Sequence, residues 1–315
     1  MKIALITPAR PAARSGNRNT AMRWAQLLRE LGHAVDVQMD WNGAPADLMI
    51  ALHARRSHGS IARFAAAYPS RPLGLALTGT DLYRDIRFDA DAKRSLRLAT
   101  RMIVLQQLGL AELAPALRRK TRVIYQSTQP IRRVPPLSSC FEVCISGHLR
   151  DEKDPFRLAA ALSYLPPQSR IRVTHLGAAM SGDIAAAARG WMEREPRYRW
   201  LGERPHWQAL HRLARSRLMV ISSRMEGGAN VVTEALAAGV PVIASRIPGN
   251  IGMLGADYAG YYPLGDERAL ARLLWRAESD PEFYRKLKHQ CAARRCLVSR
   301  KREKQGLKQL LAELD

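Results

Sequence analysis

Short apolar runs alternate with amphipathic stretches along most of the chain, a pattern that predicts strands separated by helices. In the first part of the chain, the expected strands are Lys2–Thr7, Ala34–Gln38, Leu48–Leu52 and Leu73–Leu77. Apolar residues at helical spacing predict a helix that ends at Gly32, and a second helix is expected at Ser60–Ala67. Strands that alternate with helices indicate a parallel sheet covered by helices on both faces, so the fold class is α/β.

The alternation breaks once and then restarts. Residues 131–139 include RRVPPLSS and are interpreted as an interdomain linker. Beyond them, the expected elements are strands at Cys140–Ser146, Ile171–Leu176 and Val240–Ala244 and a helix at Phe156–Leu162. We predict a Rossmann-like domain at residues 1–130, a second one at residues 140–280, and a basic helical segment at residues 281–315 that crosses back to the first domain.

The most informative stretch is Glu226–Ser245, which reads EGGANVVTEALAAGVPVIAS. Its glycines, Gly227–Gly228, let the backbone approach a bulky ligand closely, and a helix is expected at Asn230–Ala238. A glycine turn that opens a helix offers amide N–H groups and a positive dipole end to an anion. Because Glu226 and Glu234 can accept hydrogen bonds from hydroxyls, the stretch predicts a site for a nucleotide sugar.

This stretch resembles the signature of the retaining glycosyltransferases of the GT-B class, family four. That signature is a glutamate, seven residues, a second glutamate, a small-residue helix, a glycine and a proline–valine strand. The resemblance implies two Rossmann-like domains facing across a cleft, with Glu226 beside the donor sugar and Glu234 on the ribose hydroxyls. The donor-binding residues that it implies in this stretch are Gly227, Gly228, Ala229, Asn230, Val231 and Glu234.

A second motif, SGHLRDEKD at Ser146–Asp154, is similar to a family loop of glycine, arginine and leucine with a lysine four positions after the leucine. In the family, both cations neutralise the departing diphosphate, the charge that grows in the transition state. Lys153 falls on the lysine position, whereas His148 takes the arginine position as a donor-binding residue. Because a histidine is only partly charged near neutrality, Arg150 is the candidate for the missing cation. The implied catalytic residues are Glu226, Lys153 and Arg150.

The loop before the first helix departs from the family, which has two glycines there against the donor phosphate. An arginine fork matches phosphate oxygens bidentately, so the arginines that have entered this loop favour a tetrahedral anion as acceptor. The acceptor-binding residues assigned on this ground are Arg14, Gly16, Asn17, Arg18 and Asn19.

A further segment of the first domain, Thr78–Asp81, is similar to a family segment that reads histidine-glycine-x-aspartate, with threonine in the histidine position. Asp81 has two interpretations, as a site residue or as the cap of the next helix. His53 and His58 also have two interpretations, as histidines that face the cleft or as solvated loop histidines, and the second is the commoner case for a lone histidine in a loop.

Together, SGNRNTAMRWAQLL, GHLRDEKDPFRLAAALSYLP and the Glu226 stretch resemble the selenosugar synthases of selenoneine biosynthesis. The resemblance implies UDP-N-acetylglucosamine as donor and selenophosphate as acceptor, with release of UDP and phosphate and formation of a 1-seleno-sugar. An acceptor that is already anionic needs anchoring and aim rather than a base, and no base, metal or cofactor is assigned. The alternative is a conventional UDP-sugar glycosyltransferase with a hydroxyl acceptor on a sugar or a lipid.

The formal net charge is +22, and much of it lies between Arg285 and Lys308. A nucleic-acid-binding protein is a third hypothesis, but no helix-turn-helix, zinc pair or aromatic RNA motif is visible, so we expect no nucleic acid partner. The basic segment is interpreted as a solvated helix that draws anionic substrates to the protein. No apolar run approaches the roughly 20 residues that span a bilayer, so we expect no stable membrane insertion. Because the cysteines show no CxxC pair, we expect reduced thiols and a cytoplasmic location.

Overall fold

The computed structural model describes residues 1–11 and 15–314, and the chain divides into two compact units. The first unit comprises Met1–Ser127, Glu226–Asn230 and the residues from Ser299 onward. The second comprises Thr128–Met225 and Val231–Val298. The short segment Glu226–Asn230 therefore belongs with the N-terminal residues, although it lies far along the chain.

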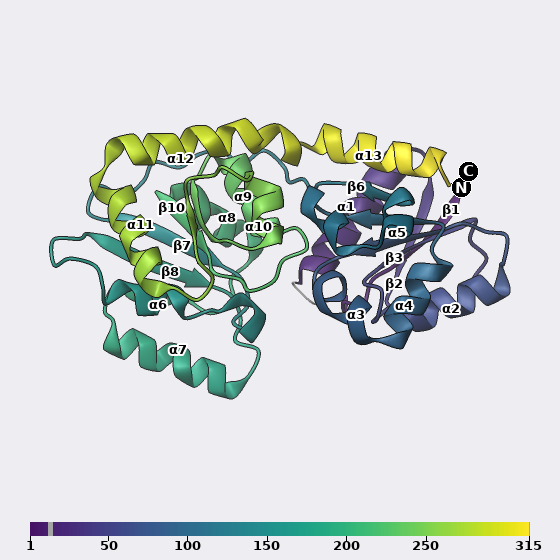
Figure 1. The fold of residues 1–315 in the computed structure, drawn as a ribbon, viewed down its shortest axis with the longest axis horizontal. Helices are drawn as coiled ribbons and strands as arrows, with labels where there is room; N and C mark the ends of the chain where they lie inside the picture. Colours follow the sequence, from purple (N-terminus) through teal and green to yellow (C-terminus); the bar gives the residue numbers. More distant parts are fainter. Residues whose placement is uncertain (12–14, 315) are drawn as a thin grey trace. The chain divides into compact units, whose positions relative to one another are not determined.

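The first unit is built on a parallel six-stranded sheet in the order β2-β1-β3-β4-β5-β6. Both ends of the chain lie in this unit (Figure 1). Its strands are β1 Lys2–Ile6, β2 Ala34–Gln38, β3 Leu48–Leu52, β4 Leu73–Leu77, β5 Arg101–Val104 and β6 Thr121–Val123. Its helices are α1 Gly16–Arg29, α2 His58–Ala67, α3 Ile86–Phe88, α4 Ala90–Leu98, α5 Pro115–Arg119 and α13 Arg300–Ala312. Every residue of β3 and β4 is buried, because α1 and α13 pack on one face of the sheet and α2 and α4 on the other.

A buried carboxylate fastens α13 to α1. The side chain of Glu303 is fully buried and accepts hydrogen bonds from Arg23 Nε at 2.9 Å, Trp24 Nε1 at 2.7 Å and the Ser127 amide at 2.9 Å. A buried charge is tolerated where it is paired and hydrogen-bonded, and both conditions hold here. The C-terminal helix is therefore part of the first unit's core.

The second unit repeats this design with a parallel sheet in the order β12-β11-β10-β7-β8-β9. Its strands are β7 Phe141–Ser146, β8 Ile171–Leu176, β9 Tyr198–Trp200, β10 Leu218–Ile221, β11 Val242–Ser245 and β12 Tyr261–Tyr262. Its helices are α6 Arg157–Leu162, α7 Gly182–Arg194, α8 His206–Arg215, α10 Pro248–Leu254, α11 Glu267–Ser279 and α12 Pro281–Arg294; α9, Asn230–Ala238, begins at the last residue of the first unit's short segment.

The predicted α/β fold class is confirmed, and several elements have the expected bounds, among them β2, β3, β4, β8 and α9. Residues 131–139 form no helix or strand, and Val134 donates its amide to the Ala214 carbonyl of the second unit. The strand expected at Val240–Ala244 begins later, because Gly239, with a φ of 67°, and the two residues after it form the turn out of α9. No helix in the described part of the chain combines the length and apolarity needed to cross a membrane.

Candidate functional site

A pocket lies at the carboxyl ends of β7 and β10 in the second unit, the edge of an open parallel sheet at which ligands bind. Its walls are formed by residues after β7, residues after β10 and the first turn of α9. The lining residues that carry polar groups or belong to the predicted site are Ser146, Gly147, His148, Lys153, His175, Ser222, Ser223 and Val231. Three predicted donor-site residues, His148, Lys153 and Val231, are thus brought to one pocket.

Lys153 is held in the pocket wall by its backbone. It ends the 3-10 turn Asp151–Lys153, and the next residue, Asp154, has a left-handed φ of 45°. Ser222 Oγ, at the end of β10, lies 2.9 Å from the carbonyl oxygens of both Lys153 and Asp154 and donates to them. These hydrogen bonds therefore link the loop after β7, which carries Lys153, to the loop after β10, which carries Ser222.

His148, at the position of the family arginine, is oriented by a backbone amide. The Ala178 N–H donates to His148 Nδ1 at 3.2 Å, so Nδ1 carries a lone pair and the ring proton is on Nε2. His148 can therefore donate a hydrogen bond without being charged. Arg150 is not one of the residues that line this pocket; its side chain is 45% exposed and its Nε lies 4.0 Å from Glu152 Oε2.

His175, a lining residue that the sequence did not single out, forms the buried floor of the pocket. It lies on β8, is 1% exposed, and its Nδ1 is 2.8 Å from the Tyr198 hydroxyl. Burial lowers the pKa of His175 to about 4, so the ring is neutral near pH 7 and adds no charge to the pocket.

Glu234 has a partner that sequence reasoning missed. His206, the first residue of α8, places its Nε2 2.8 Å from Glu234 Oε1 on α9. The hydrogen bond with Glu234 raises the pKa of His206. The Glu234 side chain is 11% exposed, whereas that of His206 is 59% exposed, so the carboxylate is covered by an exposed histidine. The only local signal was that His206 opens a helix directly after Pro205.

The two glycines of the Glu226 stretch face the protein itself. A Cβ atom at Gly227 would lie 2.3 Å from the Thr78 carbonyl oxygen, and one at Gly228 would lie 2.6 Å from Leu105 Cβ. These neighbours follow β4 and β5 within the first unit. Close approach of the chain itself is thus one reason for glycine at both positions, and close approach to a ligand stays a prediction.

The ends of this stretch are buried as well. Glu226 is 8% exposed and Ala229 is 3% exposed. Burial raises the pKa of Tyr83, and Glu226 adds to that rise, which places this carboxylate near the phenol within the first unit. Asn230 accepts a hydrogen bond from Arg23 Nη1 at 3.4 Å through its Oδ1.

The predicted acceptor loop opens α1. Arg14 lies outside the described residues, and Gly16, Asn17, Arg18 and Asn19 form the first turn of the helix. Ser15 caps it: its Oγ accepts from the Arg18 amide at 3.4 Å and its carbonyl oxygen from the Asn19 amide at 3.0 Å. The capped turn leaves the amides of Gly16 and Asn17 as the helix N–H groups that point outward. A Cβ at Gly16 would lie 3.5 Å from Asn230 Nδ2, so the first turn of α1 lies next to Asn230 of the Glu226 stretch within the first unit.

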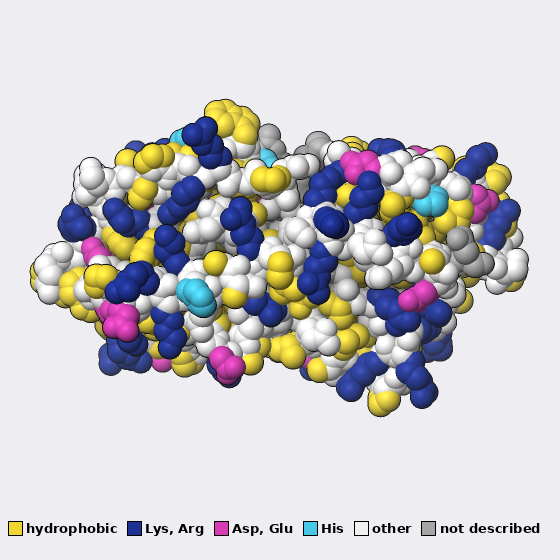
Figure 2. All heavy atoms as spheres, turned by 90° about the horizontal axis from the view of Figure 1, so that it is seen from above, with side chains coloured by type: hydrophobic (Ala, Val, Ile, Leu, Met, Phe, Trp, Pro, Cys, Tyr) yellow, Lys and Arg dark blue, Asp and Glu magenta, His cyan; other side chains and the backbone are white. Residues whose placement is uncertain are grey.

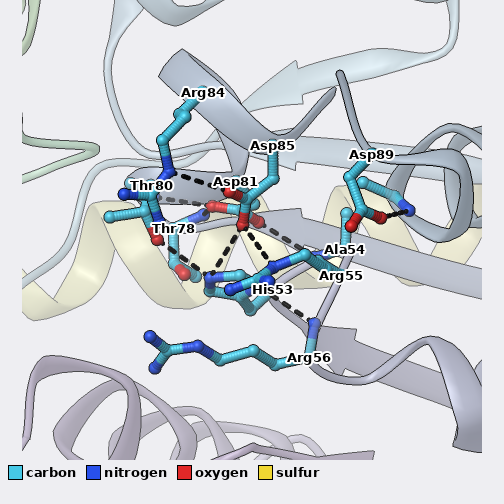
Figure 3. A network of polar contacts seen from close by, with 12 residues as sticks. His53, Ala54, Arg55, Arg56, Thr78, Thr80, Asp81, Arg84, Asp85 and Asp89 are labelled. Carbon is cyan, nitrogen blue, oxygen red and sulfur yellow. Dashed lines mark hydrogen bonds and ion pairs between the residues drawn. The ribbon is translucent and has the colours of Figure 1, made fainter. Parts of the chain in front are cut away.

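Asp81 organises the loops after β3 and β4 (Figure 3). Its Oδ1 accepts from the amides of Thr78 and Gly79, and its Oδ2 from the amide of Ala54, all at 2.9 Å. Of the two interpretations of Asp81, these contacts support a structural role, although its partners are loop amides instead of the next helix.

His53 is fully buried at the centre of this network, which contradicts its interpretation as a solvated loop histidine (Figure 3). It has a left-handed φ of 75°, which is strained for a histidine. Its Nδ1 accepts from the Arg56 amide at 3.3 Å, so the proton on Nε2 points to Thr80 Oγ1 at 3.0 Å. Burial lowers the pKa of His53 and keeps the ring neutral. His58 is also held by the protein, with Nδ1 2.9 Å from Ser95 Oγ.

Across residues 1–11 and 15–314, no three histidine, cysteine or acidic side chains are grouped so that they could hold a metal ion. Lys and Arg side chains predominate over acidic ones on the face shown in Figure 2. Some of the C-terminal cations already have partners: Arg294 donates to the carbonyls of Met253 and Gly252, and Lys304 pairs with Glu30.

A sequence profile of the family described as glycosyl transferases group 1 matches residues 131–294. No curated protein sequence matches the chain.

Solved structures with the same fold are numerous. Anabaena HepE in complex with UDP-glucose is 18% identical, with a TM-score of 0.78 and coverage of 100% of this chain and 99% of that one. Sucrose-phosphate synthase from Thermosynechococcus elongatus is 18% identical, with a TM-score of 0.78 and coverage of 99% and 98%. S. aureus TarM, solved with alpha-GlcNAc-glycerol and UDP, is 14% identical, with a TM-score of 0.65 and coverage of 85% and 55%. At these identities the likeness shows the fold alone, and it agrees with the predicted GT-B class.

Proposed function

The chain belongs to the glycosyl transferases group 1 family, and from this membership we propose that it transfers a sugar from UDP-N-acetylglucosamine to the selenium of selenophosphate. The product is a 1-seleno-sugar, as in the selenosugar synthases of selenoneine biosynthesis that its sequence resembles. The transfer of a glycosyl group follows from the family, whereas the donor sugar and the acceptor are our proposal.

The observation that carries the donor half is the convergence of His148, Lys153 and Val231 on one pocket at the carboxyl ends of β7 and β10. Lys153 would hold the diphosphate, with Arg150 or His148 as its second ligand, and the first turn of α9 adds amide N–H groups that favour an anion. Glu234 would bind the ribose, and Glu226 would lie beside the sugar. The UDP-glucose in Anabaena HepE and the UDP in TarM support a uridine nucleotide as the leaving group.

The acceptor half rests on the capped N-terminus of α1. The outward-pointing amides of Gly16 and Asn17 and the cationic side chain of Arg18 suit a tetrahedral dianion, and Asn19 completes the turn. Its first residue adjoins Asn230 of the donor stretch. Binding selenophosphate next to the turn formed by residues 226–230 would orient its selenium toward the donor sugar, and orientation is what an already ionised nucleophile needs.

The chemistry is written as two steps. A selenium lone pair of selenophosphate forms the Se–C1 bond while the bond from C1 to the diphosphate oxygen breaks, and UDP leaves with that electron pair. Water then cleaves the Se–P bond of the adduct, releasing phosphate and leaving the selenol or selenolate of the sugar. Lys153 would stabilise the charge that grows on UDP in the first step. We place the reaction in the cytoplasm, in line with four cysteines that are free thiols.

The test is UDP release from UDP-N-acetylglucosamine, measured anaerobically with and without selenophosphate, together with mass spectrometry of the product. We expect release only with selenophosphate and a selenium-containing sugar. UDP release that ignores selenophosphate would overturn the acceptor and leave the glycosyltransferase. A conventional hydroxyl acceptor is the second candidate, and the structure of TarM in complex with alpha-GlcNAc-glycerol and UDP favours it, because in that compound the sugar is joined to a hydroxyl oxygen.

A further inference from the structure

The hydrogen bond between His206 and Glu234 has consequences for nucleotide binding. The two residues come from different elements of the second unit, α8 and α9, and their atoms are 2.8 Å apart. Glu234 lies at the fifth position of α9, directly after the turn that opens the helix. Its carboxylate is nearly buried, and His206 donates a hydrogen bond to it from another element.

An ionised carboxylate has two oxygens and about four acceptor positions. His206 uses one position on Oε1, which leaves enough for the two neighbouring hydroxyls of a ribose. To donate to both carboxylate oxygens of Glu234, the two hydroxyls require one defined rotation of the carboxylate. A glutamate without a hydrogen-bond partner would lose rotational freedom when the nucleotide binds, which would weaken the binding. The N–H of His206 fixes that rotation in advance.

We propose that His206 is a positioning residue that orients Glu234 toward the ribose diol of the nucleotide. The inference rests on the proposed function, in which Glu234 binds the ribose of a UDP-sugar. His206 acts through Glu234 and does not contact the reacting atoms. Its removal should therefore weaken the binding of nucleotides that carry both ribose hydroxyls and leave nucleotides without them unaffected.

The experiment measures the Kd of UDP and of 2′,3′-dideoxy-UDP by calorimetry for the full chain. For His206→Ala we expect about tenfold weaker binding of UDP, which corresponds to ~1.4 kcal/mol, and no change for the dideoxy nucleotide. His206→Gln, which can still donate to the carboxylate, should recover part of the loss. His211→Ala is the matched control, because His211 is an exposed histidine on the same helix.

A double variant tests whether His206 acts through Glu234. In a Glu234→Ala background, His206→Ala should have no further effect on the Kd of UDP. Equal losses for both nucleotides, no loss at all, or an undiminished loss in the Glu234→Ala background would each overturn the inference. Wild-type protein that binds both nucleotides equally would overturn it too, by removing the ribose role of Glu234. Wild-type protein that binds no UDP would instead overturn the proposed donor, and the inference with it.

Discussion

At the scale of single residues, the pocket is unusual because a histidine stands where the family has a permanent cation. The Ala178 amide donates to His148 Nδ1, which leaves Nε2 as the ring nitrogen that can donate to a ligand. His175 on the pocket floor is neutral near pH 7, because burial lowers its pKa to about 4. Lys153 is the one lysine or arginine among the residues found to line this pocket in the described chain. The stabilisation of a leaving diphosphate should therefore depend on Lys153 more than on any other side chain.

Replacing Lys153 by alanine should lower kcat by about 100- to 1000-fold, the range found when one preorganised donor to a developing anion is removed. The measurement is the steady-state rate of UDP release at saturating donor and acceptor. Arg150→Ala is the comparison, because its side chain is exposed and does not line the pocket. A larger loss in Arg150→Ala would show that the leaving group is held outside this pocket.

Replacing Arg18 by alanine should raise the KM for selenophosphate by about tenfold or more, the effect of losing one charge-assisted contact, and leave the KM for the UDP-sugar nearly unchanged. The reason is that Arg18 belongs to the first turn of α1 and is not one of the residues that line the pocket after β7 and β10. Arg29→Ala, in the last turn of the same helix, controls for loss of helix stability. Equal increases in both KM values would contradict the acceptor assignment.

His175 should make the stability of the protein depend on pH. Its pKa is about 4 in the folded protein and about 6.5 in an unfolded chain, so the unfolded state binds more protons between these values. Stability from this residue is complete above pH 6.5 and is lost as the pH falls toward 4, by at most ~1.4 kcal/mol per pH unit. The measurement is the free energy of unfolding in urea from pH 4 to 7. In His175→Gln, the contribution of His175 to the pH dependence of this free energy should be absent. An unchanged slope would contradict the burial of a neutral ring.

At the scale of elements, the C-terminal helix α13 is held by one carboxylate. Glu303 receives hydrogen bonds from Arg23, Trp24 and Ser127, and it is fully buried among them. In contrast, Glu313 near the end of α13 pairs with Arg101 and Arg122 on the surface. The two glutamates offer a comparison between a buried and an exposed ion pair on the same element.

Replacing Glu303 by glutamine should destabilise the protein by about 3–5 kcal/mol, because it leaves a buried arginine without its charge partner and sets an amide N–H₂ against donors. Glu313→Gln should cost about 0–1 kcal/mol, as exposed ion pairs do. The measurement is equilibrium unfolding in urea with circular dichroism. Similar losses in the two variants would mean that Glu303 is not buried in solution.

The elements were largely predictable from the sequence, whereas several of the contacts were not. Strands such as Leu48–Leu52 and Leu73–Leu77 are apolar throughout because both faces are covered, and helix ends such as Gly239 carry their own signal. The partner of Glu234 could not be predicted, since His206 lies on another helix and no local pattern links the two. The same holds for His53, whose neighbours Thr80 and Asp85 follow the next strand along the chain.

At the scale of the whole molecule, the net charge of +22 should act on substrate encounter. A strongly positive surface raises the local concentration of anions, and salt screens this effect over about 10 Å at 0.1 M. Raising the NaCl concentration should therefore lower kcat/KM for the anionic UDP-sugar several-fold with little change in kcat. Sucrose at matched osmolality is the control. A kcat/KM that is independent of salt would show that the basic surface serves another partner.

The packing of Gly227 on Thr78 and of Gly228 on Leu105 bears on how this protein can be recombined with its relatives. The turn formed by residues 226–230 belongs to the second half of the sequence but packs on residues of the first half. In a chimaera joined at Ser127, this turn would therefore pack on loops that come from another protein. A Cβ at Gly227 would meet the Thr78 backbone and one at Gly228 would meet Leu105 Cβ, and neither atom can move without its main chain. Exchange of halves between relatives must therefore transfer residues 226–230 together with the loops after β4 and β5. The set of residues that must be exchanged together is therefore discontinuous in the sequence, and its boundaries are recognised only from the folded structure.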